Sequence, residues 1–296
     1  SRGLGDVYKR QGDDNLYVRL KTGDGWDNIK GKPATFHNEV YSTNDSIVRV
    51  DKMWYTFPIG DKVTGTVGPL IENYYMLAAT PSVYKPKVLK AFRFGGHGIA
   101  FGASTSVAAG LKYVGDNGFA TSITLNSKNA DDAVGLLTDG DQNKVNIMGA
   151  YTGENYHLSA TFTTQQKGYT GGYPYFSTAK AKQTGKDLNG IALRGWWRPD
   201  ETGTAVPSIS VGFDTVSYTI PSGTAGYEEG EGYSIALNWE DMFQANDVIG
   251  VAFGQPIRGT QPVGGQAADV EPFLWEAYYS FRPVSYTHLR AHETKR

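Results

Sequence analysis

Residues 15–282 alternate apolar and polar side chains with a period of two, in segments of about ten residues. In 118–127, for example, Ile123 and Leu125 alternate with Thr124 and Asn126. Successive side chains of a strand point to opposite faces, so each segment would have one apolar and one polar face. No stretch with helical periodicity competes, and the chain is predicted to be nearly all β. About twelve strands are expected, at 15–22, 46–57, 61–70, 105–114, 118–127, 143–152, 156–165, 188–198, 206–217, 231–239, 248–256 and 271–282.

The connections between these predicted strands alternate between short and long. Outer-membrane barrels have short periplasmic turns and long extracellular loops, whereas a soluble sandwich has no reason to keep every second connection long. We therefore predict a transmembrane antiparallel up-and-down β-barrel whose short connections are periplasmic and whose long ones are extracellular. The short connections are 58–60, 115–117, 153–155, 199–205 and 240–247, and the long ones are 23–45, 71–104, 128–142, 166–187, 218–230 and 257–270.

Two further features indicate that lipid covers the apolar face. Aromatic residues gather beside the short connections, as in the girdle of rings at a membrane interface; they are Tyr55, Tyr113, Tyr151, Tyr156, Trp197 and Trp239. The opposite face is polar and charged, as a water-filled lumen requires; it carries Asn126, Asn146, His157, Thr161, Arg194, Ser210, Asp214, Asn238, Glu240, Glu276 and Arg282. A one-layer antiparallel sheet with its polar face in water, or a β-sandwich, remains the alternative.

One strand has an inconsistent register. In 46–57, Val48 and Val50 share a face with Lys52, whereas Met53 and Tyr55 lie on the other face. An extra residue in one strand of a pair reverses the faces beyond it, so a bulge is expected near Lys52.

Composition excludes several classes of protein. The sequence contains no cysteine, so it has no disulfide framework, thiolate metal site or cysteine nucleophile. A net charge of −2 and a pI near 6.2 argue against a nucleic-acid partner, which would require a basic face. No run of 18 apolar residues occurs, so no transmembrane helix is expected.

Motifs that would carry catalysis are weak. The glycines of 95–102 do not follow a strand and open a helix, as a dinucleotide site requires. Asp139 and Asp141 have a calcium-like spacing, but the glutamate that completes such a loop is missing. His37, His97 and His157 are not spaced for a metal or a nucleophile. We therefore expect no enzyme, no bound metal and no cofactor.

The two ends of the sequence differ from the rest. Residues 1–11 and 284–296 break the alternating pattern and resemble translated sequencing-adapter read-through. We expect both segments to be non-native and 12–283 to form the barrel segment. A genuine basic tail is the alternative for these ends.

Several strings of the sequence resemble a known family. They are YTFPIGDKV (55–63), KDLNGIALRGWWRPDETGTAVPSISVGFDT (186–215), GYSIALNWEDMFQANDVIGVAFGQP (232–256) and EPFLWEAYYSFRP (271–283). These are similar to the carbohydrate-selective porin family of the outer membrane, in its cyanobacterial branch of iron-uptake porins. The resemblance implies a barrel of about 16 strands, a homotrimer in a Gram-negative-type, cyanobacterial outer membrane, and passive diffusion of small solutes. It also implies that an N-terminal domain, the first barrel strands and the last ones lie outside this sequence.

The leading functional hypothesis is a passive channel for sugars, inorganic ions and iron species. A soluble or surface β-protein that binds carbohydrate through Trp196 and Trp197 is the alternative. Lipid-facing Leu, Val and Ile would support the channel, and a polar coat the alternative. The residues predicted to line the pore are Arg19, Lys21, Lys112, Arg194, Asp214 and Glu276. The long 71–104 connection is predicted to fold into the lumen and constrict it. Its basic residues Lys85, Lys87, Lys90 and Arg93 would then face Asp214 and Glu276, and Tyr74 and Tyr75 could stack on a sugar. A surface cap with solvated lysines is the alternative.

Overall fold

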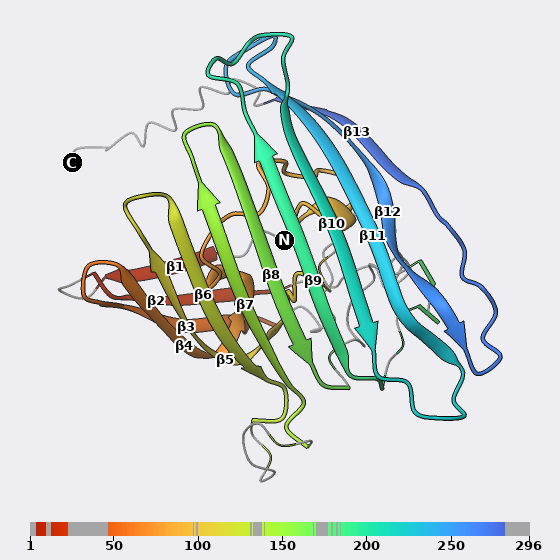
Figure 1. Ribbon diagram of the computed structural model, residues 1–296. Helices are drawn as coiled ribbons and strands as arrows, with labels where there is room; N and C mark the ends of the chain where they lie inside the picture. Colours follow the sequence, from red (N-terminus) through yellow and green to blue (C-terminus); the bar gives the residue numbers. More distant parts are fainter. Residues whose placement is uncertain are drawn as a thin grey trace, which may run out of the picture.

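A computed structural model of the chain contains one antiparallel sheet of thirteen strands, hydrogen-bonded in chain order from β1 to β13 (Figure 1). It describes residues 4–9, 13–22, 47–96, 98, 100–130, 132, 138, 140–167, 169, 177–178, 180–181, 183 and 185–281, with the backbone alone for 4–9 and 90. The strands are β1 (Leu4–Lys9), β2 (Asn15–Lys21), β3 (Arg49–Ile59), β4 (Val63–Glu72), β5 (Thr105–Val114), β6 (Phe119–Ser127), β7 (Asn143–Thr152), β8 (Tyr156–Gln165), β9 (Leu188–Trp197), β10 (Ser208–Tyr218), β11 (Gly226–Glu240), β12 (Val248–Val263) and β13 (Leu274–Ser280).

Helix is almost absent from the described residues. Two 3-10 turns, η2 (Asn73–Tyr75) and η3 (Lys90–Phe92), interrupt the connection between β4 and β5. Nowhere in this part of the chain is a helix long and apolar enough to span a bilayer. The predicted all-β, up-and-down antiparallel fold is confirmed.

The strand β1 was not expected. It lies within 1–11, the segment that resembles adapter read-through, and it pairs with β2 from Leu4 opposite Leu20 to Lys9 opposite Asn15. That 1–11 and 284–296 are non-native stays a prediction, and 284–296 lies outside the described residues.

The strands β11 and β12 are longer than the sequence pattern predicted. Both continue through residues expected to be loop, 226–230 and 257–263. The predicted loops 218–230 and 257–270 are therefore shorter in the structure than the sequence indicated. The connection 219–225 is consequently shorter than 198–207 on the opposite side, and the alternation of short and long connections is not strict. The extensions are rich in polar residues, because a strand that projects into water does not need an apolar face.

The two faces of the sheet invert the usual arrangement of a soluble protein. Apolar side chains point outward and are exposed, such as Leu158 at 62%, whereas Asn146 on the inner face is fully buried. Exposed large apolar residues occur on every strand from β2 to β13 except β12. An apolar outer face and a polar inner one are typical of outer-membrane barrels. The predicted outer aromatic row is also present, with Tyr55, Tyr151, Tyr156 and Trp197 exposed beside the short turns.

The predicted bulge is present in β3. Arg19 is paired with Lys52, but the next residue, Leu20, is paired with Val50, so Asp51 has no opposite partner. The bulge leaves Val50 exposed on the outer face, while Lys52 is buried on the inner face. One extra residue thus changes which parity of the strand faces inward.

The core lies between the concave face of the sheet and the 73–104 segment, which we call the inner segment. In Figure 1 this gold-coloured segment passes behind the middle strands. Phe94 and Phe101 of the inner segment pack against Met148, Ala192 and Val216 of the strands, and all five are buried. The sequence predicted a water-filled lumen that 71–104 enters and constricts; in the structure this segment covers much of the concave face and buries the side chains beneath it.

Candidate functional site

The inner segment is closed at its base by Asn73. The Asn73 amide donates to the Ser104 carbonyl at 3.0 Å, and the Ser104 amide donates to Asn73 Oδ1 at 2.7 Å. Asn73 Nδ2 donates to the Gly102 carbonyl at 2.8 Å and to Asn146 Oδ1 of β7 at 3.0 Å. Asn73 therefore joins the two ends of the segment to each other and to the sheet.

Asn146 extends this neutral network across three strands. Its Nδ2 donates to Thr163 Oγ1 at 2.7 Å, and the Thr163 hydroxyl donates to the Ala100 carbonyl at 2.9 Å. Thr124 Oγ1 donates to Asn146 Oδ1 at 3.2 Å. Gly102 has a φ of +76°, and a Cβ there would lie 1.7 Å from Asn146 Nδ2. The network therefore requires glycine at this position.

An ion pair beneath the inner segment attaches it to β9 and β10. Arg194 Nη2 donates to Asp214 Oδ1 at 2.6 Å, and neither side chain is exposed. Arg194 Nε donates to the Phe94 carbonyl at 2.7 Å, which binds the segment to the pair. The segment approaches so closely here that a Cβ on Gly212 would lie 1.7 Å from the Gly95 carbonyl oxygen.

A third attachment joins the inner segment to β13 through Glu276. Tyr84 Oη donates to Glu276 Oε1 at 2.5 Å, and the amides of Val88 and Leu89 donate to Oε2 at 3.2 and 2.5 Å. Burial raises the pKa of Tyr84 well above its usual range, so its hydroxyl stays protonated and acts as a donor. Glu276 thereby orders a stretch of backbone that forms no regular structure of its own.

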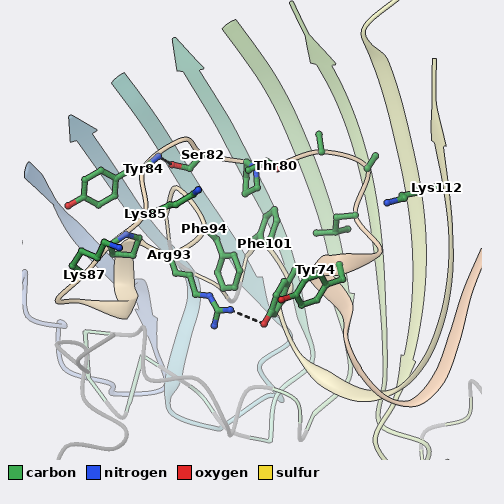
Figure 2. Close-up of a pocket in the computed structure, with 16 residues that line it drawn as sticks. Tyr74, Thr80, Ser82, Tyr84, Lys85, Lys87, Arg93, Phe94, Phe101 and Lys112 are labelled. Carbon is green, nitrogen blue, oxygen red and sulfur yellow. Dashed lines mark hydrogen bonds between the residues drawn. The ribbon is translucent and has the colours of Figure 1, made fainter. Parts of the chain in front are cut away.

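These attachments leave a hollow of about 690 Å³ on the concave side of the sheet, bordered by the inner segment and Lys112 of β5 (Figure 2). Its charged lining is entirely basic: Lys85, Lys87, Arg93 and Lys112, with no Asp or Glu among the described lining residues. Arg93 Nη2 donates to Tyr74 Oη at 2.9 Å, and its guanidinium carbon lies 5.0 Å from the centre of the Tyr74 ring. The volume falls within the range of roughly 300–1,000 Å³ that is usual for small-molecule sites.

The structure divides the predicted site residues into two sets. Lys112 and five residues of the inner segment lie together around the hollow; the five are Tyr74, Tyr75, Lys85, Lys87 and Arg93. Lys90 belongs to η3, but its side chain is outside the described residues. Three predicted pore residues lie instead beneath the inner segment, with exposures of 3% for Arg194, 0% for Asp214 and 2% for Glu276.

The remaining predicted residues lie on β2. Arg19 is half-buried and forms ion pairs with Asp51 at 2.6 Å and Glu72 at 3.2 Å. Lys21 is also half-buried, at the end of the same strand.

The predicted opposition of inner-segment cations to Asp214 and Glu276 is not what the structure shows. Asp214 is paired with Arg194 of the neighbouring strand, and Glu276 accepts its bonds from a hydroxyl and two amides. The prediction was wrong because it treated these carboxylates as open to the lumen, whereas the segment itself covers them.

The motifs that sequence analysis set aside lie partly outside the described residues. His37, His97 and Asp139 lie outside the described residues, as does Arg282. Asp141 is buried and accepts a hydrogen bond from Ser127. In the part of the chain that the structure describes, no three His, Asp or Glu residues are grouped so that they could hold a metal ion.

Sequence reasoning missed the role of Asn73, which has no strand pattern around it. The signals available were the inward Asn146 and the glycine-rich 95–102 string. Glycines allow backbone to approach a strand closely, so that string marked a packing site.

No protein-family model matches the chain, and no curated protein matches it. Among solved structures, Pseudomonas putida OprB has a TM-score of 0.50 at 10% identity, covering 83% of this chain and 64% of that chain. The outer-membrane channel DcaP of Acinetobacter baumannii has a TM-score of 0.44 at 10% identity, covering 94% and 84%. The chain thus spans 64% of the OprB chain that it matches. At this identity the likeness shows the fold alone, which is that of an outer-membrane β-barrel.

Proposed function

We propose that this chain forms the wall and constriction of an outer-membrane porin that passes small hydrophilic solutes by diffusion. The observation that carries the proposal is the inverted sheet, apolar outside and polar inside, with a basic hollow on its concave side. An aqueous lumen requires a polar inner wall, and lipid requires an apolar outer one. The exposed apolar residues on the outer face argue against the alternative of a soluble carbohydrate-binding protein with a polar coat.

The inner segment is the proposed constriction. Its rings and basic side chains, together with Lys112, narrow the lumen and set its charge, while Arg19 and Lys21 belong to the wall. We assign Arg194, Asp214 and Glu276 to a different role from the one sequence predicted: they hold the constriction in place. Lys90 stays in the predicted constriction set on sequence grounds.

Finer features of the proposal rest on the resemblance of the sequence strings. They are membership of the cyanobacterial branch of carbohydrate-selective porins, sugars, inorganic ions and iron species as solutes, a homotrimer, and a cyanobacterial outer membrane. The non-native origin of 1–11 and 284–296 is proposed on a different ground, which is that both segments break the alternating pattern and resemble translated sequencing-adapter read-through.

Reversal potentials test the constriction. The full-length protein would be reconstituted in planar lipid bilayers under a salt gradient, and an Arg93→Glu, Lys112→Glu double variant compared with it. We expect the preference of the channel to shift from anions toward cations, because two basic side chains at the hollow become acidic. Lys62→Glu is the matched control, because Lys62 lies in the turn after β3, paired with Asp116, away from the hollow. Equal reversal potentials for the double variant and the unmodified protein would refute the constriction.

A further inference from the structure

A continuous row of aromatic rings leads along the concave side to the hollow. The rings come from two strands and the inner segment, so residues far apart in sequence pack into one row, in which Trp54, Phe94 and Phe101 are buried and Tyr75 is exposed. Neighbouring centres are 4.1 to 5.2 Å apart, a spacing at which rings stack or tilt against each other. The row contains Tyr17, Trp54, Tyr75, Tyr74, Phe94 and Phe101 in that order.

Basic charge is superimposed on this row. The Arg93 guanidinium carbon lies 5.0 Å from the centre of the Tyr74 ring and 5.2 Å from that of Phe94. Figure 2 shows Arg93 beside these rings, with Lys85 and Lys87 on the same segment and Lys112 extending from β5. Glu72, which precedes Tyr74 and Tyr75 in the chain, forms an ion pair with Arg19.

This combination matches one kind of ligand. A flat ring gains favourable contact on an aromatic surface, and a carboxylate accepts two parallel hydrogen bonds from a guanidinium. Arg93 packs over the ring of Tyr74, whose other neighbour in the row is the exposed ring of Tyr75. A ligand therefore contacts both Tyr75 and Arg93 when its carboxylate is attached to the ring itself. A sugar without charge uses only the rings, and a short acid such as acetate uses only the cations.

We infer that the hollow is a binding site for small cyclic carboxylates, in which Tyr75 stacks on the ring and Arg93, packed over Tyr74, binds the carboxylate. Hexuronates and aromatic acids share this chemistry. The inference rests on the proposed channel function and names the class of solute that the constriction favours. The site is already ordered by the contacts of Asn73, Arg194 and Glu276, so little freedom is lost when a ligand binds.

Calorimetric titration of the full-length protein in detergent tests binding independently of conduction. The probes are glucuronate and benzoate, with glucose and acetate as the ring-only and charge-only controls. We expect at least one cyclic acid to bind about tenfold more tightly than both controls, since only it uses rings and cations together. Tighter binding of glucuronate identifies a hydroxylated ring as the preferred partner, and tighter binding of benzoate an aromatic one.

Two variants at exposed positions separate the two contributions. Tyr75→Leu should weaken binding of the cyclic acid about tenfold while Tyr75→Phe preserves it, because the ring rather than the hydroxyl makes the contact. Arg93→Gln should reduce binding of the acid to the level of glucose. Lys62→Gln, outside the hollow, should leave it unchanged. Equal binding of glucuronate, benzoate, glucose and acetate, or no binding of either cyclic acid, would overturn the inference. Binding without conductance in bilayers would instead refute the channel function alone.

Discussion

The inner segment is attached to the sheet in two regions that use different chemistry. At its base, Asn73 is hydrogen-bonded to Asn146 of β7, which is bonded in turn to the hydroxyls of Thr124 in β6 and Thr163 in β8, and all four side chains are uncharged. Farther along, it is bound to β9, β10 and β13 through the charged side chains of Arg194, Asp214 and Glu276.

This difference predicts how much folding free energy is lost when a side chain is removed from each region. Neutral hydrogen bonds contribute about 1 kcal/mol each, and losing one partner leaves a buried polar atom unsatisfied. A buried charge is far more costly to leave alone, because its desolvation is no longer offset by its partner. The charged region therefore depends on each of its members more than the neutral base does.

The largest effect should come from Asp214→Ala. This change leaves the Arg194 guanidinium buried without its carboxylate, which costs about 3–5 kcal/mol of folding free energy. The measurement is the urea concentration at which half of the barrel is unfolded. The folded fraction is detected by its heat-modifiable migration on gels, which is lost on unfolding. An Arg194→Met, Asp214→Leu double variant is the control and should cost less, because no charge remains buried. A single variant as stable as the double would contradict the importance of the charge.

Asn146→Ala tests the uncharged attachment of the inner segment near Asn73. Thr124, Thr163 and Asn73 each lose a partner, and we expect destabilisation of about 2–3 kcal/mol. Urea unfolding at low and high salt measures it, and the loss should be nearly the same in both because the side chains of Asn73, Thr124, Asn146 and Thr163 are uncharged. Asn189→Ala on the exposed outer face of β9 is the matched control, with an effect within about 0.5 kcal/mol. A loss that falls away in high salt would contradict the neutral assignment.

Gly212→Ala tests how closely the charged region holds the segment. The added methyl group would collide with the Gly95 carbonyl, so the segment must shift, at a cost of about 1–3 kcal/mol. Limited proteolysis should then cleave within 73–104. Gly149→Ala is the control, because a Cβ there meets nothing within 4 Å. Equal protease resistance in both variants would show that the contact is loose.

The smallest effect should be a response to acid outside both regions, at the 241–247 turn. Although burial opposes it, hydrogen bonds from Tyr279 and from the amides of 242–244 hold the pKa of Asp247 below its usual value. A carboxyl with a depressed folded pKa stabilises the turn above its unfolded pKa of about 4, and this support is lost as pH falls through the folded value. Proteolysis at 241–247 should therefore increase in acid, while cleavage near the uncharged attachment at Asn73 should not. Asp247→Asn should abolish the pH dependence. Cleavage of the unmodified turn that is independent of pH would contradict this.

The sequence predicted the sheet well because period-two alternation is a local property. Leu158 and Asn146 could be assigned to opposite faces from their neighbours alone, and the bulge at Asp51 followed from a parity change. The extensions of β11 and β12 were missed because strands in water need not alternate. For the inner segment, the sequence predicted only that it folds inward, and not which strands it contacts.

The contacts that position the candidate site depend on pairs distant in the chain. Nothing near Asn73 indicates Asn146, and nothing near Glu276 indicates Tyr84. Arg194 and Asp214 were recognised as inward residues, but their pairing through adjacent strands and their burial under Phe94 depend on the fold. A polar side chain on an inner face can line a channel or hold a covering segment, and only the segment's path decides between these roles.

The closure of the inner segment at Asn73 and Ser104 has a consequence for how the proposed channel can change. Because the two ends are bonded to each other, the stretch between them emerges from and returns to one point on the wall. Its length and composition can vary while the register of β4 and β5 stays the same. A new solute preference can therefore arise when the inner segment is replaced while the strands around it stay the same.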